Sequence, residues 1–302
     1  MSTTQIESIL KDWALWPSLC SSAPSLEQVS PLVDGLTNSN WLLTIDTNEE
    51  LGNQTNSDVQ QYVIRINATN NLALKLNRQA EWDMHQNIAD FNICPPFIYK
   101  DPKDIYWIRP FLKNHTLASA LNTNTNVLTP EFLKNIARQL KLIHSVPVSK
   151  SWPSINFPEL IEHYWQQIKA KKNNSQCEFE ARFKTLRETL DVTLQGEEYT
   201  PCLCHMDPNP SNWILDNQKQ HLIDWEYAAL GNKAWDIAVF CDTCNLTPQQ
   251  IDIFLKSYGA ITNKQFKLAS VQMQYLSLLW FYVQDHLSDA ALHKALVELP
   301  SR

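Results

Sequence analysis

A short hairpin pattern within residues 204–228, CHMDPNPSNWILDNQKQHLIDWEYA, constrains the fold of this chain more than any other feature. Residues 213–215 and 222–223 are apolar, and the polar residues 216–220 between them are typical of a turn that joins two antiparallel strands. The segments before and after this stretch repeat their apolar residues every three to four positions, as amphipathic helices do. The pattern therefore predicts one hairpin embedded in a helical region.

The same stretch gathers several polar side chains. His205, Asp207 and Asn212 follow the spacing H-x-D-x-x-x-x-N in the loop before the hairpin. Asp224 and Glu226 stand at alternate positions, which would put them on one face if the second arm continues as a strand. For any one of these residues a turn-capping role is a simple alternative. Turn capping does not require this combination in this order, so we interpret the set as a reactive site.

The chemistry of these groups suits the transfer of a phosphoryl group. Mg²⁺ prefers oxygen ligands and keeps part of its coordination shell for water and substrate phosphates. Asn212 and Asp224 offer such oxygens. Asp207 is a separate carboxylate on a constrained loop, and it could accept the proton of a substrate hydroxyl while the metal holds the phosphates.

The N-terminal part of the chain is predicted to be rich in strands. Residues 29–45 read as a strand, a small polar turn and a second strand, and residues 61–66, QYVIRI, read as a third. The apolar segment 105–112 contains Pro110, which cannot donate a backbone hydrogen bond, so it is interpreted as an edge strand or a linker.

The C-terminal part is predicted to be mainly helical. One helix is predicted at the start of the chain, at 4–13. In the C-terminal part, helices are predicted between the Thr129 N-cap and Pro147, and at 157–172, 177–194, 234–244, 248–258 and about 263–286. This order of elements predicts an α+β fold of two lobes. We expect a small β-rich lobe at residues 1–112, a larger helical lobe at 113–302, and the site in the cleft between them.

One charged residue stands within a predicted strand of apolar character. Burial of the Arg65 guanidinium would cost free energy unless it has anionic partners. Glu81, in the helix that follows, is one candidate partner, and a phosphate is another. A guanidinium that reaches solvent is the structural alternative. The turn at 34–40 could present N–H groups and hydroxyls to a phosphate, although a single glycine such as Gly35 in a hairpin is usually only a turn residue.

Composition argues against several classes of partner. A net charge of −7 and an isoelectric point near 5.6 do not provide the basic surface that nucleic acids require. No apolar run approaches the ~20 residues that span a bilayer, and the N-terminus does not follow the pattern of a secretory signal. We therefore expect a cytoplasmic protein with no nucleic-acid or membrane partner.

The seven cysteines do not predict a disulfide framework, because their number is odd. Cys202-x-Cys204 and Cys241-x-x-Cys244 could together supply four sulfur ligands to a zinc ion. The first pair belongs to a strand that leads into the loop at 205–212, and the second lies in a helical pattern. Buried free thiols are the simpler interpretation, and the zinc site is the alternative.

These motifs resemble those of the aminoglycoside phosphotransferase and choline kinase superfamily. The resemblance rests on HMDPNPSN and LIDWEYA, supported by GLTNSN, VIRI, LNRQAE, PFLKNHTL and LIHS, which together span most of residues 33–240. It implies a protein-kinase-like fold of two lobes. Within the superfamily the chain looks most similar to bacterial choline, ethanolamine and thiamine kinases.

The resemblance implies a role for each matched residue of the C-terminal lobe. Asp207 would be the catalytic base, and His205 would support the catalytic loop. Asn212 and Asp224 would be the magnesium ligands, with Glu226 as a second acidic group near the metal.

In the N-terminal lobe the resemblance implies a site for ATP. Arg65, paired with Glu81, would hold the phosphates, and an arginine can bridge phosphates bidentately where many relatives have lysine. Pro110 would offer its carbonyl and Leu112 its N–H to the adenine ring. The turn residues that would cover the phosphates are Gly35, Thr37, Asn38 and Ser39.

The acceptor is indicated least directly. Eleven tryptophans and nine tyrosines are a generous supply for binding a cation. Tyr227, Trp235 and Trp280 are candidate contacts, although core packing is the commoner role of such residues. We expect an ATP-dependent kinase of a small cationic alcohol such as choline, ethanolamine or thiamine. The alternatives are an aminoglycoside-type antibiotic phosphotransferase and a non-catalytic nucleotide-binding protein.

Overall fold

The computed structural model describes residues 3–17, 19–32, 38–46, 59–68, 76–113, 115–123, 126–171, 183–190, 199–215 and 219–299. The chain divides into two compact units, Met1–Asn114 and His115–Arg302. The predicted lobe boundary, between residues 112 and 113, lies close to this division.

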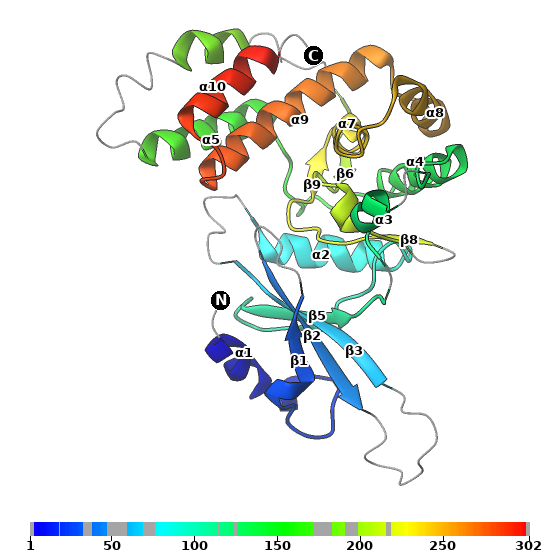
Figure 1. The fold of residues 1–302 in the computed structure, drawn as a ribbon, viewed down its shortest axis with the longest axis vertical. Helices are drawn as coiled ribbons and strands as arrows, with labels where there is room; N and C mark the ends of the chain where they lie inside the picture. The colour runs from blue at the N-terminus through cyan, green and yellow to red at the C-terminus, as the bar shows by residue number, and fades with distance from the viewer. Residues whose placement is uncertain are drawn as a thin grey trace. The chain divides into compact units, whose positions relative to one another are not determined.

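The first unit is built on an antiparallel sheet (Figure 1). In spatial order its described strands are β1 (Val29–Pro31), β2 (Ser39–Asp46), β3 (Val59–Ile66), β5 (Tyr106–Pro110) and β4 (Tyr99–Lys100). β5 therefore lies inside the sheet, so its interpretation as an edge strand or linker is wrong. Pro110 is tolerated because it is the last residue of β5, where it faces Tyr62 of β3.

Side-chain alternation along the strands gives this sheet two different faces. On one face, Ile64 and Tyr106 belong to an apolar core that includes α1 (Thr3–Leu10). On the other face, Trp107 meets Trp82 of α2 (Arg78–Ala89) edge to face, with ring centroids 5.6 Å apart. Arg65 points to this second face, since it alternates with Ile64 in β3.

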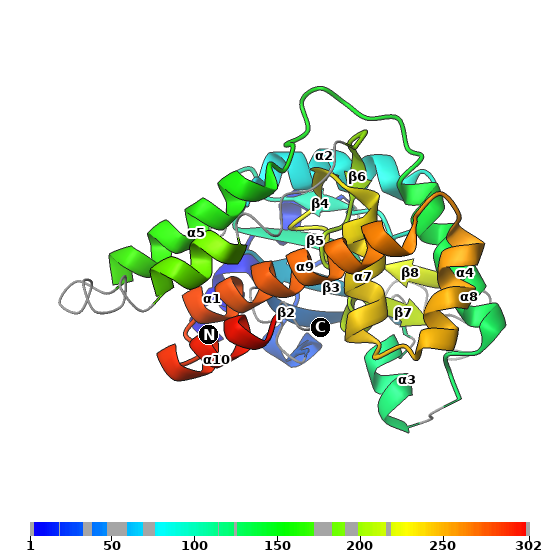
Figure 2. The same ribbon diagram turned by 90° about the horizontal axis from the view of Figure 1, so that it is seen from above.

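The second unit is mainly helical, as predicted. Its described helices are α3 (Leu117–Thr123), α4 (Pro130–Ile143), α5 (Phe157–Lys171), residues 183–190, α7 (Lys233–Thr243), α8 (Pro248–Tyr258), α9 (Asn263–Val283) and α10 (Asp289–Glu298). The long helix α9 runs alongside both α5 and α7 (Figure 2). The short helices α3 and α10 were not predicted. No helix in the described part of the chain has the length and apolar character needed to cross a bilayer.

Local capping explains why several helix ends were predictable. The hydroxyl of Thr129 accepts from the N–H of Phe132 at 3.2 Å, and Pro130 occupies the first turn of α4. α8 begins after Thr247 and is followed by its C-cap residue Gly259, which has a φ of 68°. Such a positive φ favours glycine, because a glycine has no Cβ to clash with the backbone.

Two short strand pairs interrupt the helices. β7 (Trp213–Leu215) pairs with β8 (Gln220–Leu222), which confirms the predicted hairpin. β6 (Cys202–Cys204) pairs with β9 (Ala229–Gly231), a strand that was not predicted. Gly231 is needed there, because a Cβ at this position would lie 2.9 Å from Cζ3 of Trp235.

Candidate active site

A buried aspartate on α7 anchors the loop that follows β6, residues 205–212, which we call the HMD loop. Asp236 is fully buried, and its carboxylate accepts from the backbone N–H groups of His205 and Met206, each at 2.8 Å. Met206 has a φ of 71°, a left-handed conformation that few residues other than glycine adopt. Nε2 of His144, just after α4, lies 3.0 Å from Oδ2 of the same carboxylate. Asp236 thus connects α4, α7 and the HMD loop.

His205 ties the HMD loop to the segment that follows β8. Its Nε2 lies 3.0 Å from the carbonyl oxygen of Ile223, and its Nδ1 lies 3.3 Å from the backbone nitrogen of Asp207. A carbonyl can only accept and an N–H can only donate, so these contacts require the neutral tautomer with hydrogen on Nε2. The buried ring also meets Trp225 edge to face, with centroids 4.7 Å apart. This geometry suits the supporting role predicted for His205.

The carboxylate of Asp207 is held by two asparagine amides. Nδ2 of Asn209 lies 2.9 Å from both of its oxygens, and Nδ2 of Asn212 lies 3.2 Å from Oδ2. The pKa of Asp207 is raised to about 6, chiefly by burial; the nearby Glu226 contributes to this rise, whereas the two amides oppose it. A carboxylate that titrates close to neutral pH is suited to proton transfer.

The structure corrects the prediction that Asp224 and Glu226 share one face of a strand. β8 ends at Leu222, and Asp224 has a φ of 67°, which interrupts the extended backbone. The indole N–H of Trp225 then donates to the Leu222 carbonyl at 2.9 Å, and Ala228 N lies 3.0 Å from the Trp225 carbonyl. Asp224 therefore lies in irregular backbone and Glu226 in the turn that follows it, and we call this segment, residues 223–228, the acidic turn. Asp224 is half-buried and Glu226 is buried.

The oxygen donors around Asp207 fit a hard divalent cation. Asn212 uses its Nδ2 on the carbonyl and carboxylate of Asp207, so its Oδ1 is the side-chain atom left to act as a ligand. The N–H of Ile223 donates to the main-chain oxygen of Asn212 at 2.9 Å, which places the residue before Asp224 next to the HMD loop. Glu226 lies close enough to raise the pKa of Asp207. An amide oxygen and carboxylates are ligands that Mg²⁺ prefers.

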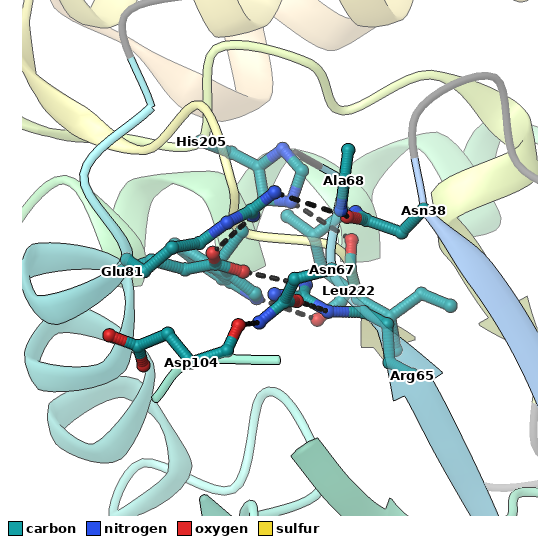
Figure 3. Close-up of polar contacts among 11 residues, drawn as sticks. Asn38, Arg65, Asn67, Ala68, Glu81, Asp104, His205 and Leu222 are labelled. Carbon is teal, nitrogen blue, oxygen red and sulfur yellow. Dashed lines mark hydrogen bonds and ion pairs between the residues drawn. The ribbon is translucent and has the colours of Figure 1, made fainter. Parts of the chain in front are cut away.

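In the first unit, Arg65 is buried against an acidic partner. It is 5% exposed, and its Nη1 lies 2.6 Å from Oε1 of Glu81, which confirms the predicted pair and excludes the solvent-directed alternative. Its Nε donates to Oδ1 of Asn67 at 3.1 Å, and its guanidinium lies over the ring of Trp107, 4.5 Å from the centroid. Figure 3 shows Arg65, Glu81 and Asn67 turned toward one another.

Arg78, which was not among the residues predicted from the sequence, completes this cluster. Its Nη1 lies 2.9 Å from Oε2 of Glu81, and its Nη2 donates to Oδ1 of Asn38 at 3.1 Å. The same Asn38 oxygen accepts from the N–H of Ala68 at 3.1 Å (Figure 3). Two guanidinium groups and one carboxylate leave the Arg65–Glu81–Arg78 cluster with a formal charge of +1. The sequence pattern that could have indicated this ion pair is the three-residue spacing of Arg78 and Glu81, which is about one helical turn.

The predicted phosphate turn is described only in part. Asn38 is 4% exposed, and Ser39, the first residue of β2, is 8% exposed. Asn38 is held by Arg78, so the described end of the turn is joined to the arginine cluster. Gly35 and Thr37 lie outside the described residues.

The residues predicted to contact adenine follow the end of β5. The carbonyl oxygen of Pro110 accepts from Nη1 of Arg109 at 3.1 Å. The N–H of Phe111 donates to the carbonyl of Gln61 at 2.9 Å, which holds the chain against β3 just before the half-buried Leu112. A carbonyl oxygen has a second lone pair, so the contact with Arg109 does not prevent Pro110 from accepting another hydrogen bond.

The three predicted aromatic contacts make different interactions. Trp280 on α9 donates its indole N–H to the hydroxyl of Tyr227 at 2.9 Å, so these two side chains lie together next to the acidic turn. Trp235 on α7 is 1% exposed and donates its indole N–H to Oε1 of Gln272 at 2.8 Å. Trp235 also lines a cavity of about 1050 Å³, together with Phe157 and other residues of the second unit.

The sequence matches the phosphotransferase enzyme family over residues 28–271, which is most of the chain. The chain belongs to this phosphotransferase family. Among curated relatives, a homologue of protein LicA from Mycoplasma capricolum is 26% identical over 208 residues. The match covers 69% of this chain and 78% of the relative.

Solved structures share the fold of this phosphotransferase. The crystal structure of the choline kinase LicA from Streptococcus pneumoniae has a TM-score of 0.71 and 20% identity, and the match covers 100% of both chains. An ADP-bound aminoglycoside phosphotransferase has a TM-score of 0.65 and 17% identity, with 99% of this chain and 97% of that one covered. These similarities confirm the predicted kinase-like α+β fold.

Asp236, which holds the HMD loop of this phosphotransferase, was not among the residues predicted from the sequence. The sequence did contain a pattern that indicates a buried carboxylate, because Asp236 is an acidic residue inside the apolar helical stretch KAWDIAVF. A buried carboxylate in such a position needs hydrogen-bond donors. The sequence does not tell which donors these are, since His205 and Met206 are distant from Asp236 along the chain.

Proposed function

We propose that this phosphotransferase is a Mg²⁺- and ATP-dependent kinase that phosphorylates the hydroxyl of a small cationic alcohol such as choline, ethanolamine or thiamine. The observation that carries the proposal is the Asp207 carboxylate, which two asparagine amides hold and whose pKa burial raises to about 6. Transfer to a hydroxyl requires a base at the acceptor and separate ligands for the metal that accompanies the phosphates. The HMD loop and the acidic turn supply both kinds of group.

In this proposal the second unit performs the proton transfer. Asp207 accepts the proton of the acceptor hydroxyl as the hydroxyl oxygen attacks the γ-phosphorus of ATP, the bond from that phosphorus to the β-phosphate oxygen breaks, and ADP leaves. Asn212 and Asp224 would hold Mg²⁺, with Glu226 as a further acidic group. Bound Mg²⁺ supplies positive charge that offsets the charge of the transferring phosphates. His205 does not touch the reacting atoms, and its two hydrogen bonds keep Asp207 in position relative to the segment that carries Asp224.

The first unit would bind the nucleotide. The positive charge of the Arg65–Glu81–Arg78 cluster suits phosphate oxygens, and Glu81 orients both guanidinium groups. Asn38 and Ser39 would cover the phosphates together with the preceding turn residues, Gly35 and Thr37. The carbonyl of Pro110 and the N–H of Leu112 would bind the adenine edge. The ADP bound to a relative of the same fold supports a nucleotide as the donor.

The acceptor is proposed from aromatic and acidic groups that lie together. Trp280 and Tyr227 form a hydrogen-bonded aromatic pair, and Tyr227 directly follows the buried Glu226. Aromatic faces with a nearby carboxylate attract quaternary or primary ammonium groups. Trp235 stays a further candidate through the cavity that it lines. The similarity to the choline kinase LicA supports choline as the first alcohol to test.

A panel of acceptors tests the proposal directly. We would incubate the protein with Mg-ATP and choline, ethanolamine, thiamine or gentamicin, measure ADP release, and identify the phosphorylated product by mass spectrometry. Turnover is expected with a cationic alcohol. If gentamicin is the only acceptor that is phosphorylated, the cationic-alcohol proposal is wrong and the alternative of an antibiotic phosphotransferase is favoured. Binding of Mg-ATP without turnover on any acceptor would favour the non-catalytic alternative.

The variant Asp207→Asn tests the assignment of the base. It should abolish turnover, while a thermal shift by Mg-ATP is retained because the arginine cluster is unchanged. Asp252→Asn is the matched control, since the Asp252 side chain is 58% exposed on α8 and has no role in the proposed site. Full activity of Asp207→Asn would show that another group is the base.

A further inference from the structure

Three side chains with soft or borderline ligand atoms converge next to the HMD loop. Cys202 and Cys204 are two residues apart on β6, so their side chains leave the strand on the same face. Their Sγ atoms are 3.8 Å apart. A ring nitrogen of His144 joins them, and the three ligand atoms all lie within 4.8 Å of one another. None of these residues is among those proposed to bind ATP, Mg²⁺ or the acceptor.

We propose that His144, Cys202 and Cys204 form a binding site for a thiophilic divalent ion of the zinc class. Zinc–sulfur bonds of 2.3 Å at a tetrahedral angle place two thiolates about 3.8 Å apart. The two Sγ atoms of β6 already have this separation, so they can bind one ion without a change in the strand. One imidazole and two thiolates are a ligand set that suits zinc, and a water molecule would complete the tetrahedron.

The site is distinct in chemistry from the oxygen site of the HMD loop. Mg²⁺ prefers oxygen ligands, whereas sulfur and imidazole ligands favour Zn²⁺. The site also differs from the four-sulfur alternative considered from the sequence. The group of potential metal ligands found in the described part of the chain contains His144 and the two β6 thiols, and it does not contain Cys241 or Cys244 of the α7 segment.

Metal binding would compete with a hydrogen bond of His144. Nε2 of His144 lies 3.0 Å from the Asp236 carboxylate, and Nδ1 lies 2.8 Å from the hydroxyl of Tyr258. Coordination by either nitrogen replaces one of these contacts, and the other contact then orients the ring. Cys202 is 9% exposed whereas Cys204 is fully buried, so Cys202 is the first of the two thiols that an entering ion would meet.

Occupation of the site should inhibit the phosphotransferase, a consequence that rests on the proposed function. Cys204 directly precedes His205, whose N–H is bonded to Asp236, and His144 contacts the same carboxylate. An ion that pulls on Cys204 and His144 therefore acts on the groups that position the HMD loop. We expect Zn²⁺ to reduce turnover, and excess Mg²⁺ should not reverse the effect.

Cobalt is the probe that tests the site, because thiolate ligands give Co²⁺ an intense near-ultraviolet charge-transfer band that oxygen ligands do not give. The reduced full-length protein would be titrated with Co²⁺ in excess Mg²⁺. One equivalent should produce this band together with tetrahedral visible bands, and Zn²⁺ should displace it. Cys202→Ser should weaken binding by at least on the order of 100-fold, since even outer groups of a metal site change affinity by 10–100-fold. Cys241→Ser, which removes another buried thiol, should bind like the wild type.

A wild-type protein without the charge-transfer band would overturn the proposal, and so would a band that persists in Cys202→Ser and disappears in Cys241→Ser. Thermal unfolding without metal checks that each variant is folded. If Cys202→Ser does not fold, the spectrum of the wild-type protein alone decides whether the site exists. The spectrum is independent of turnover, so a failed metal site and a failed kinase assignment are distinguishable. Binding without inhibition would retain the site and overturn only its effect on activity.

Discussion

Replacement of Asp207 by asparagine should change how protein stability depends on pH. Burial raises the pKa of this carboxyl from 3.8 to about 6 in the folded protein. The folded state therefore holds the Asp207 proton more tightly than the unfolded state does. The stability contributed by this proton is fully present below about pH 4 and is lost as the pH rises through about 6. An asparagine at this position does not titrate, so the variant does not share the loss.

The expected magnitude follows from the two pKa values. Each pKa unit corresponds to ~1.4 kcal/mol, so the full penalty on ionised Asp207 is ~3 kcal/mol well above pH 6. Between pH 5 and pH 8 the wild type should lose ~1.4 kcal/mol of this stability relative to Asp207→Asn. The variant also alters the hydrogen bonds from Asn209 and Asn212, and these contributions do not depend on pH in this range, so they cancel in the comparison.

Chemical denaturation at several pH values between 5 and 8, in a chelator and without Mg²⁺, measures this difference. The free energy of unfolding of Asp207→Asn minus that of the wild type should rise with pH, whereas Asp252→Asn should show no such trend. Mg²⁺ should reduce the rise, because a cation near Asp207 favours the ionised carboxylate. A difference that stays flat from pH 5 to pH 8 would refute the argument that burial holds the proton on Asp207.

The remaining predictions concern both units. Asp236→Asn should lower kcat and destabilise the protein by ~2 kcal/mol, because the two backbone N–H groups of the HMD loop donate to different carboxylate oxygens and an amide replaces one of these with an NH₂ group that cannot accept; wild-type values in rate and denaturation assays would contradict this. Arg65→Ala should raise the KM for ATP at least ~10-fold through loss of a charge-assisted phosphate contact, and Arg65→Lys should recover part of the loss, as initial rates would show. Gly231→Ala should cost ~1–3 kcal/mol in chemical denaturation, because its Cβ would lie 2.9 Å from the Trp235 ring; a variant as stable as the wild type would show that the ring can move. Trp280→Ala should raise the KM of the cationic alcohol and leave that of ATP unchanged, and equal changes in both would remove Trp280 from the acceptor site.

Local patterns in the sequence were sufficient for most of the elements. The helix that begins after Thr129 and the hairpin around residues 213–222 were predicted because caps, turns and apolar periods act over only a few residues. The partner of Arg65 was also predictable, because a buried guanidinium needs a carboxylate and Glu81 lies in the next helix. The inner position of β5 was not, since strand order depends on pairing between distant segments.

The sequence by itself predicted an α+β fold of two lobes, because helix and strand periods are short-range. Its motifs, through their resemblance to a known superfamily, implied the kinase-like form of that fold and the candidate site residues. Only the tertiary structure decided how these residues are held. The positive φ of Asp224 breaks the period of two that its strand assignment assumed. Asp236 reaches the HMD loop from another element. His144 meets Cys202 and Cys204 through the packing of α4 near β6. Such contacts join positions far apart in the chain, and no local pattern records them.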